Sequence, residues 1–169
     1  MLINAFLIKI ITTYRVCKKN NNNGECTIRA QQERDLLESR KKLLDPRDEI
    51  LKDLEKMISE EHKRGTDIII MGDTNEEIYK GKRMVSFLQK TNMKSIIKPD
   101  LEEKLPATHD QGTGCIDLLA ISAHCDESAV IKCGYLPFYL GNPSDHRGYY
   151  CNINTGAFLT TQNLISQAI

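Results

Sequence analysis

Four short apolar runs stand out against the polar background of this chain. They lie at residues 6–13, 68–71, 115–122 and 148–153. Each is too short for a helix and rich in residues that favour strands, so we predict buried β-strands there. Both alternating faces of 6–13 are apolar almost throughout, which predicts a strand in the middle of a sheet. Weaker patterns predict a short strand within 94–97 and one or two more within 128–140.

Three longer segments between these runs have the composition and spacing of amphipathic helices. They cover residues 31–44, 46–64 and 82–89. The second has the clearest limits, because Asp45 precedes Pro46 as an N-cap and Gly65 follows the last turn. Helices that alternate with buried strands predict a mixed α/β fold.

An acid and an amide follow the apolar run 68–71. Asp73 and Asn75 lie two residues apart after Gly72, and such residues point the same way in an extended segment. A carboxylate and a carboxamide would then face one point, which suits a metal-bound water and a phosphate oxygen. A polar turn is the alternative, since Gly, Asp and Asn all favour turns.

A second acid, Asp117, interrupts the apolar run 115–122. A buried carboxylate costs free energy unless it is paired, so Asp117 needs a partner such as a histidine or a metal. The alternative is that Asp117 points outward from an alternating strand. The adjacent Asp145 and His146 precede the last strand, and Asp117 could fix the tautomer of His146 and raise its pKa.

Length, charge and cysteine content limit the class of protein. The 169 residues suffice for one domain, and the formal net charge is zero, so any basic surface must be local. The six cysteines form no C-x-x-C pair and show no zinc-like spacing. We predict reduced thiols in an intracellular protein, nuclear or cytoplasmic, with no membrane segment and no signal peptide.

Three motifs in order resemble the C-terminal half of the endonuclease/exonuclease/phosphatase superfamily, which has the deoxyribonuclease-I-like fold. They are G-D-x-N at 72–75, I-D-L-L-A-I-S at 116–122 and S-D-H-R at 144–147. The resemblance spans about 6–153, so we expect a partial domain over 1–154 and a C-terminal tail over 155–169. T-x-Y-R-V-C and G-Y-L-P-F-Y further resemble the endonucleases of non-long-terminal-repeat retroelements. The family fold is a four-layer α/β/β/α sandwich.

The resemblance also implies a role for each polar residue at the strand ends. Asp73 would activate the attacking water, and Asn75 would position that water or the phosphate. His146, held by Asp117, would stabilise the charge of the phosphorane-like transition state. Asp145 would bind Mg²⁺ (or Mn²⁺). Tyr14 corresponds to an active-site tyrosine of the family, although Arg15-Val16 follows it where proline is usual.

The family's N-terminal half would add an asparagine and a metal-binding glutamate. The first matched strand here begins almost at Met1, so we expect an N-terminally truncated sandwich that holds its metal weakly. A second chain completing the sandwich would restore those groups.

Three functions follow from the resemblance. The first is a metal-dependent, endonuclease-like phosphodiester hydrolase acting on nucleic acid, which Lys80, Lys82 and Arg83 after the G-D-x-N motif favour. The second is a non-catalytic remnant or binding module of the same fold. The third is a phosphatase for a phosphorylated lipid or inositol.

Overall fold

The computed structural model describes residues 7–17, 27–97, 105–125, 130–138 and 144–154. The asparagine run near residue 20, most of the charged loop at 99–106 and the predicted tail at 155–169 lie outside these residues. None of the described helices is long and apolar enough to cross a membrane.

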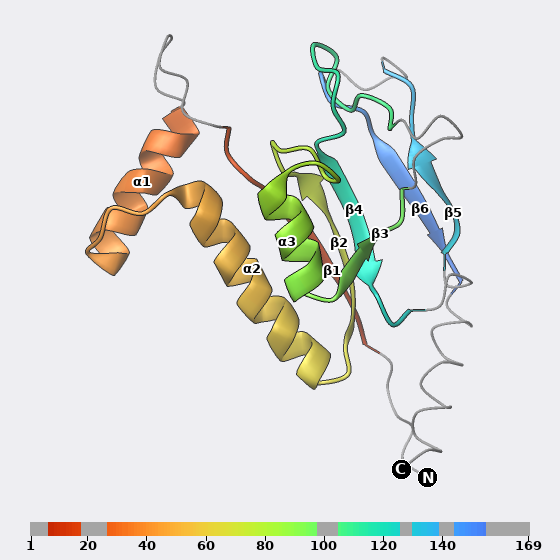
Figure 1. The fold of residues 1–169 in the computed structure, drawn as a ribbon, viewed down its shortest axis with the longest axis horizontal. Coiled ribbons are helices and arrows are strands. Elements are labelled where there is room, and N and C mark those ends of the chain that lie inside the picture. The colour runs from red at the N-terminus through yellow and green to blue at the C-terminus, as the bar shows by residue number, and fades with distance from the viewer. Residues whose placement is uncertain (1–6, 18–26, 98–104, 126–129, 139–143, 155–169) are drawn as a thin grey trace.

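Two sheets form the centre of the molecule (Figure 1). The larger contains β1 (Ile8–Tyr14), β2 (Asp67–Asp73), β4 (Asp117–Ser122) and β3 (Met93–Ser95), in that spatial order. β1 runs parallel to β2, and the other neighbours are antiparallel, so the sheet is mixed. The smaller sheet pairs β5 (Val130–Tyr135) with β6 (Tyr149–Ile153) in antiparallel fashion.

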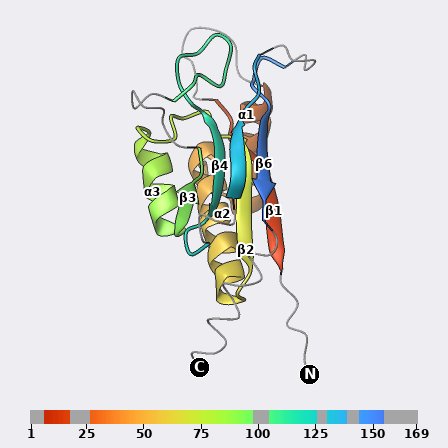
Figure 2. The same ribbon diagram turned by 90° about the vertical axis from the view of Figure 1, so that its right-hand side faces the viewer.

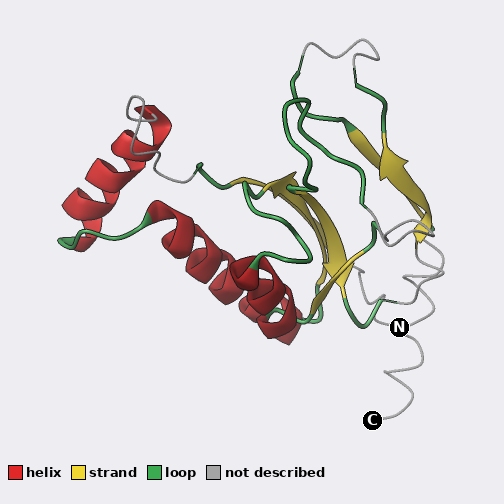
Figure 3. Cartoon of the chain, turned by 45° about the horizontal axis from the view of Figure 1, so that its top comes forward, coloured by secondary structure: helices red, strands yellow, loops and turns green. Residues whose placement is uncertain are grey.

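Three helices accompany the sheets: α1 (Thr27–Arg40), α2 (Pro46–Lys63) and α3 (Lys82–Lys90). α2 and α3 cover one face of the larger sheet, while β5 and β6 lie on its other face (Figures 1 and 3). The predicted start of α2 is confirmed, because the Asp45 side chain accepts a hydrogen bond of 2.9 Å from the Arg47 backbone N–H. Gly65, at φ 73°, lies just past its end.

Apolar residues on both faces of β2 and β4 explain why these strands are central. Ile68, Ile70 and Leu118 belong to the core beneath α2 and α3. Ile69 and Leu119 belong to a second core that includes residues of β5 and β6. The described residues thus form a helical layer and two face-to-face sheets (Figure 1), which are three layers of the expected mixed α/β sandwich. Figure 2 views the molecule from the side of the smaller sheet, so that its strands overlap those of the larger sheet.

β1 differs from its prediction. The apolar pattern predicted a strand in the middle of a sheet, but β1 lies at the edge of the sheet that the described residues form. Along most of β1, half-buried residues alternate with exposed ones, and Ile10 is 61% exposed. Hydrophobicity along one segment reports how much surface can be buried, whereas a strand's place in the sheet depends on partners elsewhere in the chain.

Candidate active site

Two carboxylates meet where β2 ends and β4 begins. The register places Asp73 directly opposite Asp117. Asp117 is only 3% exposed, which excludes the alternative that it points outward, and Asp73 is half-buried. Gly72 allows this arrangement, because a Cβ there would come within 1.8 Å of the Thr13 carbonyl oxygen on β1. Gly72 is therefore needed for close strand approach, and β2 continues through it to Asp73.

His146 lies between the two carboxylates. Its Nδ1 is 3.0 Å from Asp117 Oδ2 and 3.1 Å from Oδ1, and its Nε2 is 3.8 Å from Asp73 Oδ2. The Arg147 N–H donates to the Thr108 carbonyl at 2.8 Å and so fixes the loop that carries His146. The structure therefore brings together the histidine and the buried acid that the sequence paired.

The surroundings of His146 favour its charged form. Burial by itself lowers the pKa of His146, but the hydrogen bond to Asp117 and the negative charges of Asp117, Asp73 and Asp145 outweigh it. The net effect raises the pKa of His146 above its ordinary value of 6.5. The imidazolium is thus stabilised, and this charged form is the one that can donate a hydrogen bond to a phosphate oxygen.

Asp73 is also shifted toward its protonated form. Burial raises the pKa of Asp73, and hydrogen bonding to the Asn75 backbone and the charge of His146 oppose it without cancelling it. A carboxylate with a raised pKa is a better proton acceptor than an exposed one. The position and the pKa of Asp73 both suit a general base.

Asn75 holds Asp73 in place. Its backbone N–H donates to Asp73 Oδ1 at 2.8 Å, and its Nδ2 donates to Asp73 Oδ2 at 2.9 Å and to the Arg15 carbonyl at 2.8 Å. Its Oδ1 accepts from the Cys17 thiol at 3.3 Å. Both amide hydrogens are therefore used within the protein, so this arrangement makes Asn75 an orienting residue for Asp73. Its direct contact with water or phosphate stays a prediction.

Two buried arginines support the loop that carries Asn75. Arg15 Nη1 lies 2.7 Å from Glu76 Oε2 and 3.2 Å from the Thr74 carbonyl, and Arg47 donates to the Asn75 carbonyl at 3.1 Å. Arg47 also contacts Glu76 at 3.5 Å and the Val16 carbonyl. Sequence reasoning missed this cluster, because charged residues in helical segments and loops usually face solvent.

His109 is a further site residue that the sequence analysis did not single out. It forms an isolated β-bridge with His146, and the two rings meet edge to face with centroids 4.9 Å apart. His109 Nε2 is 3.4 Å from Asp145 Oδ2. The only signal in the sequence is a histidine beside an acid in a glycine-bearing turn, which is weak evidence by itself.

Tyr14 and Asp145 lie at the margin of the site. Tyr14 ends β1 and is the register partner of Asp73, which places it on the site's side of the strand end. Asp145 is the most exposed of the three carboxylates Asp73, Asp117 and Asp145, with its side chain 64% exposed. It lies beside His109, whose ring meets that of His146 edge to face.

Two groups of possible metal ligands share His146. One consists of His109, Asp145 and His146, and the other of Asp73, Asp117 and His146, with the ligand atoms of each group within 4.8 Å of one another. Mg²⁺ prefers oxygen ligands and is commonly bound by one or two carboxylates together with substrate phosphates and water. The accessible oxygens of Asp145 fit that mode, whereas imidazole nitrogens favour transition metals.

A solved structure is similar to this chain over part of its length. No protein-family model matches the chain, and no curated protein matches it. Among solved structures, the catalytic domain of human Nocturnin, determined with a bound sulfate anion, is similar with a TM-score of 0.42 and 15% sequence identity. The likeness covers 87% of this chain and 47% of that one, so the chain spans about half the length of the structure it matches.

Proposed function

We propose that this protein is a metal-dependent phosphodiester hydrolase that acts on nucleic acid in the manner of an endonuclease. One observation carries the proposal: His146 is held between two carboxylates, with Nδ1 3.0 Å from Asp117 and Nε2 3.8 Å from Asp73. Hydrolysis of a phosphodiester needs a proton acceptor for water and a cation for the developing phosphate charge, and Asp73 and His146 can supply them.

Each residue takes a part in this scheme. Asp73, oriented by the Asn75 amide, accepts the proton of the attacking water. The His146 imidazolium donates a hydrogen bond to a phosphate oxygen as negative charge develops there. Asp117 acts as a positioning residue, because both its oxygens face His146 Nδ1.

Asp145 would hold Mg²⁺ or Mn²⁺ through its exposed carboxylate. The metal, when bound, neutralises charge on the phosphate and makes it a better electrophile. A single exposed carboxylate binds Mg²⁺ weakly without further oxygen ligands. We therefore expect the divalent ion to bind together with substrate, and activity to require millimolar metal.

Local charge favours nucleic acid as the substrate. Lys80 and Lys82 are exposed just beyond the loop that carries Asn75, while Arg83 is paired with Asp48 at 3.0 Å. Exposed lysines near this loop can contact neighbouring phosphates of a polyanion, which a small phosphomonoester lacks. A substrate panel that includes inositol phosphates distinguishes this function from that of a phosphatase.

The test is nicking of supercoiled DNA in the presence of Mg²⁺ or Mn²⁺. We expect Asp73→Ala and His146→Ala each to lower the rate by roughly 10²- to 10⁴-fold, as loss of a general base or of transition-state stabilisation does. His62→Ala is the matched control, because His62 lies at the far end of the sheet and should keep the wild-type rate. Cleavage that survives either substitution would disprove the assignment.

A non-catalytic binding module is the second candidate, and the exposure of Asp145 favours it. Among Asp73, Asp117 and Asp145, only Asp145 is strongly exposed, and its carboxylate contacts His109 at 3.4 Å. We therefore expect the described residues to bind a metal weakly. A binding module would retain DNA in a gel shift with a strong salt dependence, without cleaving it. The same protein preparation can be used for both assays.

We also propose that another strand pairs with the edge of β1 that is left unpaired by the strands of the described residues. Leu7 and Ile10 are exposed there, and an apolar edge strand is a template for pairing with another chain. A second chain would then complete the sandwich. Light scattering would show a dimer if the partner is a second copy, and an Ile10→Lys substitution should return it to a monomer.

A further inference from the structure

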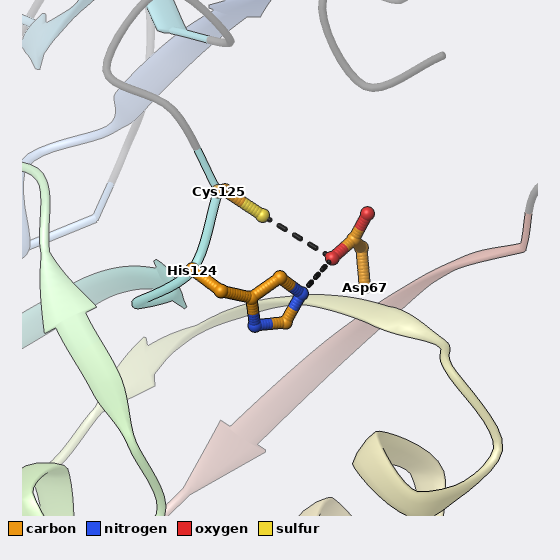
Figure 4. Close-up of side chains that lie close together, drawn as sticks. All are labelled: Asp67, His124 and Cys125. Carbon is orange, nitrogen blue, oxygen red and sulfur yellow. Dashed lines mark hydrogen bonds and ion pairs between the residues drawn. The ribbon is translucent and has the colours of Figure 1, made fainter. Parts of the chain in front are cut away.

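A second cluster of polar side chains lies at the opposite end of β2 from Asp73. Asp67 begins β2, and His124 and Cys125 lie in the turn that follows β4 (Figure 4). β2 spans Asp67–Asp73, so the two ends are about 20 Å apart at 3.3 Å per residue. The cluster is therefore separate from the candidate active site.

The three side chains converge on one carboxylate oxygen. His124 Nε2 is 2.6 Å from Asp67 Oδ1, and Cys125 Sγ is 3.3 Å from the same oxygen. One nitrogen, one oxygen and one sulfur lie within 4.8 Å of one another. Figure 4 shows the imidazole and the thiol approaching Asp67 from the same turn, so no other segment has to move to bring them together.

The burial pattern resembles that of a ligand pocket with one open side. Asp67 is 5% exposed and Cys125 is 4% exposed, whereas the His124 side chain is 42% exposed. A buried carboxylate requires a positive partner, and the exposed imidazole leaves a route by which an ion can enter.

The arrangement is unsuited to a cysteine nucleophile. Such a thiol needs an adjacent base or a cation that stabilises its thiolate. Here the thiol contacts a carboxylate, and burial together with the Asp67 charge raises the pKa of Cys125 to about 12. The thiol therefore donates to a carboxylate whose negative charge opposes formation of a thiolate nucleophile.

We propose that Asp67, His124 and Cys125 form a binding site for a transition-metal ion, best satisfied by Zn²⁺, with water as the fourth ligand. Zinc binds thiolate, imidazole and carboxylate in tetrahedral geometry, and this cluster offers one of each. One carboxylate and one thiolate neutralise the charge of the divalent ion. Mg²⁺ is excluded as the occupant, because it prefers oxygen ligands.

Binding is coupled to proton release. The Cys125 S–H bond breaks, a sulfur–zinc bond forms, and the proton passes to solvent; no electron transfer takes place. The affinity therefore rises with pH. Among the described residues, the other titratable groups around the site are Lys94, whose Nζ donates to the Cys125 carbonyl at 2.6 Å, and His62, whose ring contacts that of His124 with centroids 5.6 Å apart.

His62 is not in the ligand set. Its Nε2 is 2.9 Å from Ser122 Oγ, which in turn accepts the Ile68 backbone N–H at 2.9 Å. These contacts fix the turn after β4 against the start of β2. A metal would join the same two segments through side chains, so we expect it to stabilise the folded protein.

The experiment titrates the full-length protein with Co²⁺ as a spectroscopic substitute for Zn²⁺. Wild type should develop a thiolate-to-cobalt charge-transfer band that Zn²⁺ abolishes and Mg²⁺ does not. Cys125→Ser should lose the band, and Cys133→Ser, a matched cysteine on β5, should keep it. The His109–Asp145–His146 group has no sulfur, so metal bound there contributes no such band.

Two results would overturn the proposal: no thiolate band in wild type, or a band that remains in Cys125→Ser. His124→Asn should weaken Zn²⁺ binding by about 100-fold or more, since even outer partners of a metal ligand contribute about 10- to 100-fold. An unchanged affinity would also contradict it. If Cys125→Ser does not fold, X-ray absorption at the zinc edge of the wild-type protein decides. One sulfur ligand to zinc is expected, and the absence of a sulfur ligand would contradict the site.

Discussion

The two ends of β2 each place an aspartate beside histidine, but the histidines experience opposite environments. At the Asp73 end, contacts with Asp117 and Asp73 outweigh burial and raise the pKa of His146. At the Asp67 end, burial and the neighbouring charge of His124 lower the pKa of His62 despite the charge of Asp67. Two carboxylates around one imidazole stabilise a cation. At the other end, one carboxylate is shared by His124 and Cys125, and the three side chains offer one oxygen, one nitrogen and one sulfur ligand.

The difference between the two ends of β2 comes from the strand register and not from the types of residue present. Asp73 lies opposite Asp117 because β2 and β4 are antiparallel in this register. A shift of one residue would move Asp117 to the other face of its strand and leave His146 without its acid. The same pairing brings Ser122 next to Ile68 at the other end.

We expect the largest effect from the buried ion cluster of Arg15, Arg47 and Glu76 that supports the Asn75 loop. Glu76→Gln should lower the free energy of unfolding by about 3 kcal/mol, because it leaves the charges of Arg15 and Arg47 buried without their partner. Denaturant unfolding measures this. Asp53→Asn, which breaks an exposed pair with Arg40, is the control and should cost less than about 1 kcal/mol.

Equal effects of these two substitutions would show that the cluster does not support the Asp73 end of β2.

The pH dependence of the free energy of unfolding gives a second check on the cluster. Although burial opposes it, contact with Arg15 lowers the pKa of Glu76 below its ordinary value of 4.5. The stabilisation is present above pH 4.5 and is lost as the pH falls through the folded-state pKa, so Glu76→Gln should lose this acid-side dependence.

Asp117→Asn should have the next largest effect. It removes the carboxylate that holds His146 Nδ1, so the hydrolysis rate should fall by roughly 10- to 100-fold, the usual cost of losing an outer partner of a functional histidine. The high-pH limb of the pH–rate profile should also move to lower pH, because the imidazolium loses its main stabilising contact. A reduced rate with an unmoved limb would mean that Asp117 acts only through folding.

The smallest effect concerns stability above pH 6.5. The folded-state pKa of His146 exceeds its ordinary value of 6.5, so its contribution is fully present below 6.5 and is lost as pH rises through the folded-state pKa. The contribution of His62 has the opposite pH dependence. Its folded-state pKa is below 6.5, so its contribution to stability is present above pH 6.5 and is lost as the pH falls through the folded-state pKa. His146→Gln should flatten the decline above 6.5, and His62→Gln should not; thermal unfolding across the pH range measures both.

α2, α3 and the central strands were predictable because their signals are local, whereas the first helix was predicted at 31–44 and lies at Thr27–Arg40. Asp45-Pro46 marks the start of α2, and the apolar run before Gly72 forms β2. The Asp117–His146 contact was also predictable, since a buried carboxylate requires a partner and few candidates were present. Only burial and hydrogen-bonding chemistry were needed for that inference.

The remaining features depend on contacts between distant segments. The edge position of β1 depends on which strands pair with it, and the pattern within 6–13 does not contain that information. His109 reaches His146 through a β-bridge between two loops, and Arg47 reaches the Asn75 carbonyl from α2. The Asp67–His124–Cys125 cluster lacks zinc-like sequence spacing because Asp67 begins β2, whereas His124 and Cys125 follow β4, and these segments are far apart in the sequence.

Titration of the histidine C–H resonances by NMR tests the central claim most directly. The account predicts that His146 titrates above 6.5 and His62 below it, and that Asp117→Asn lowers the pKa of His146 while leaving that of His62 unchanged. A His146 that titrates at or below the pKa of His62 would contradict the claim that β2 and β4 hold an imidazolium ready for a phosphate.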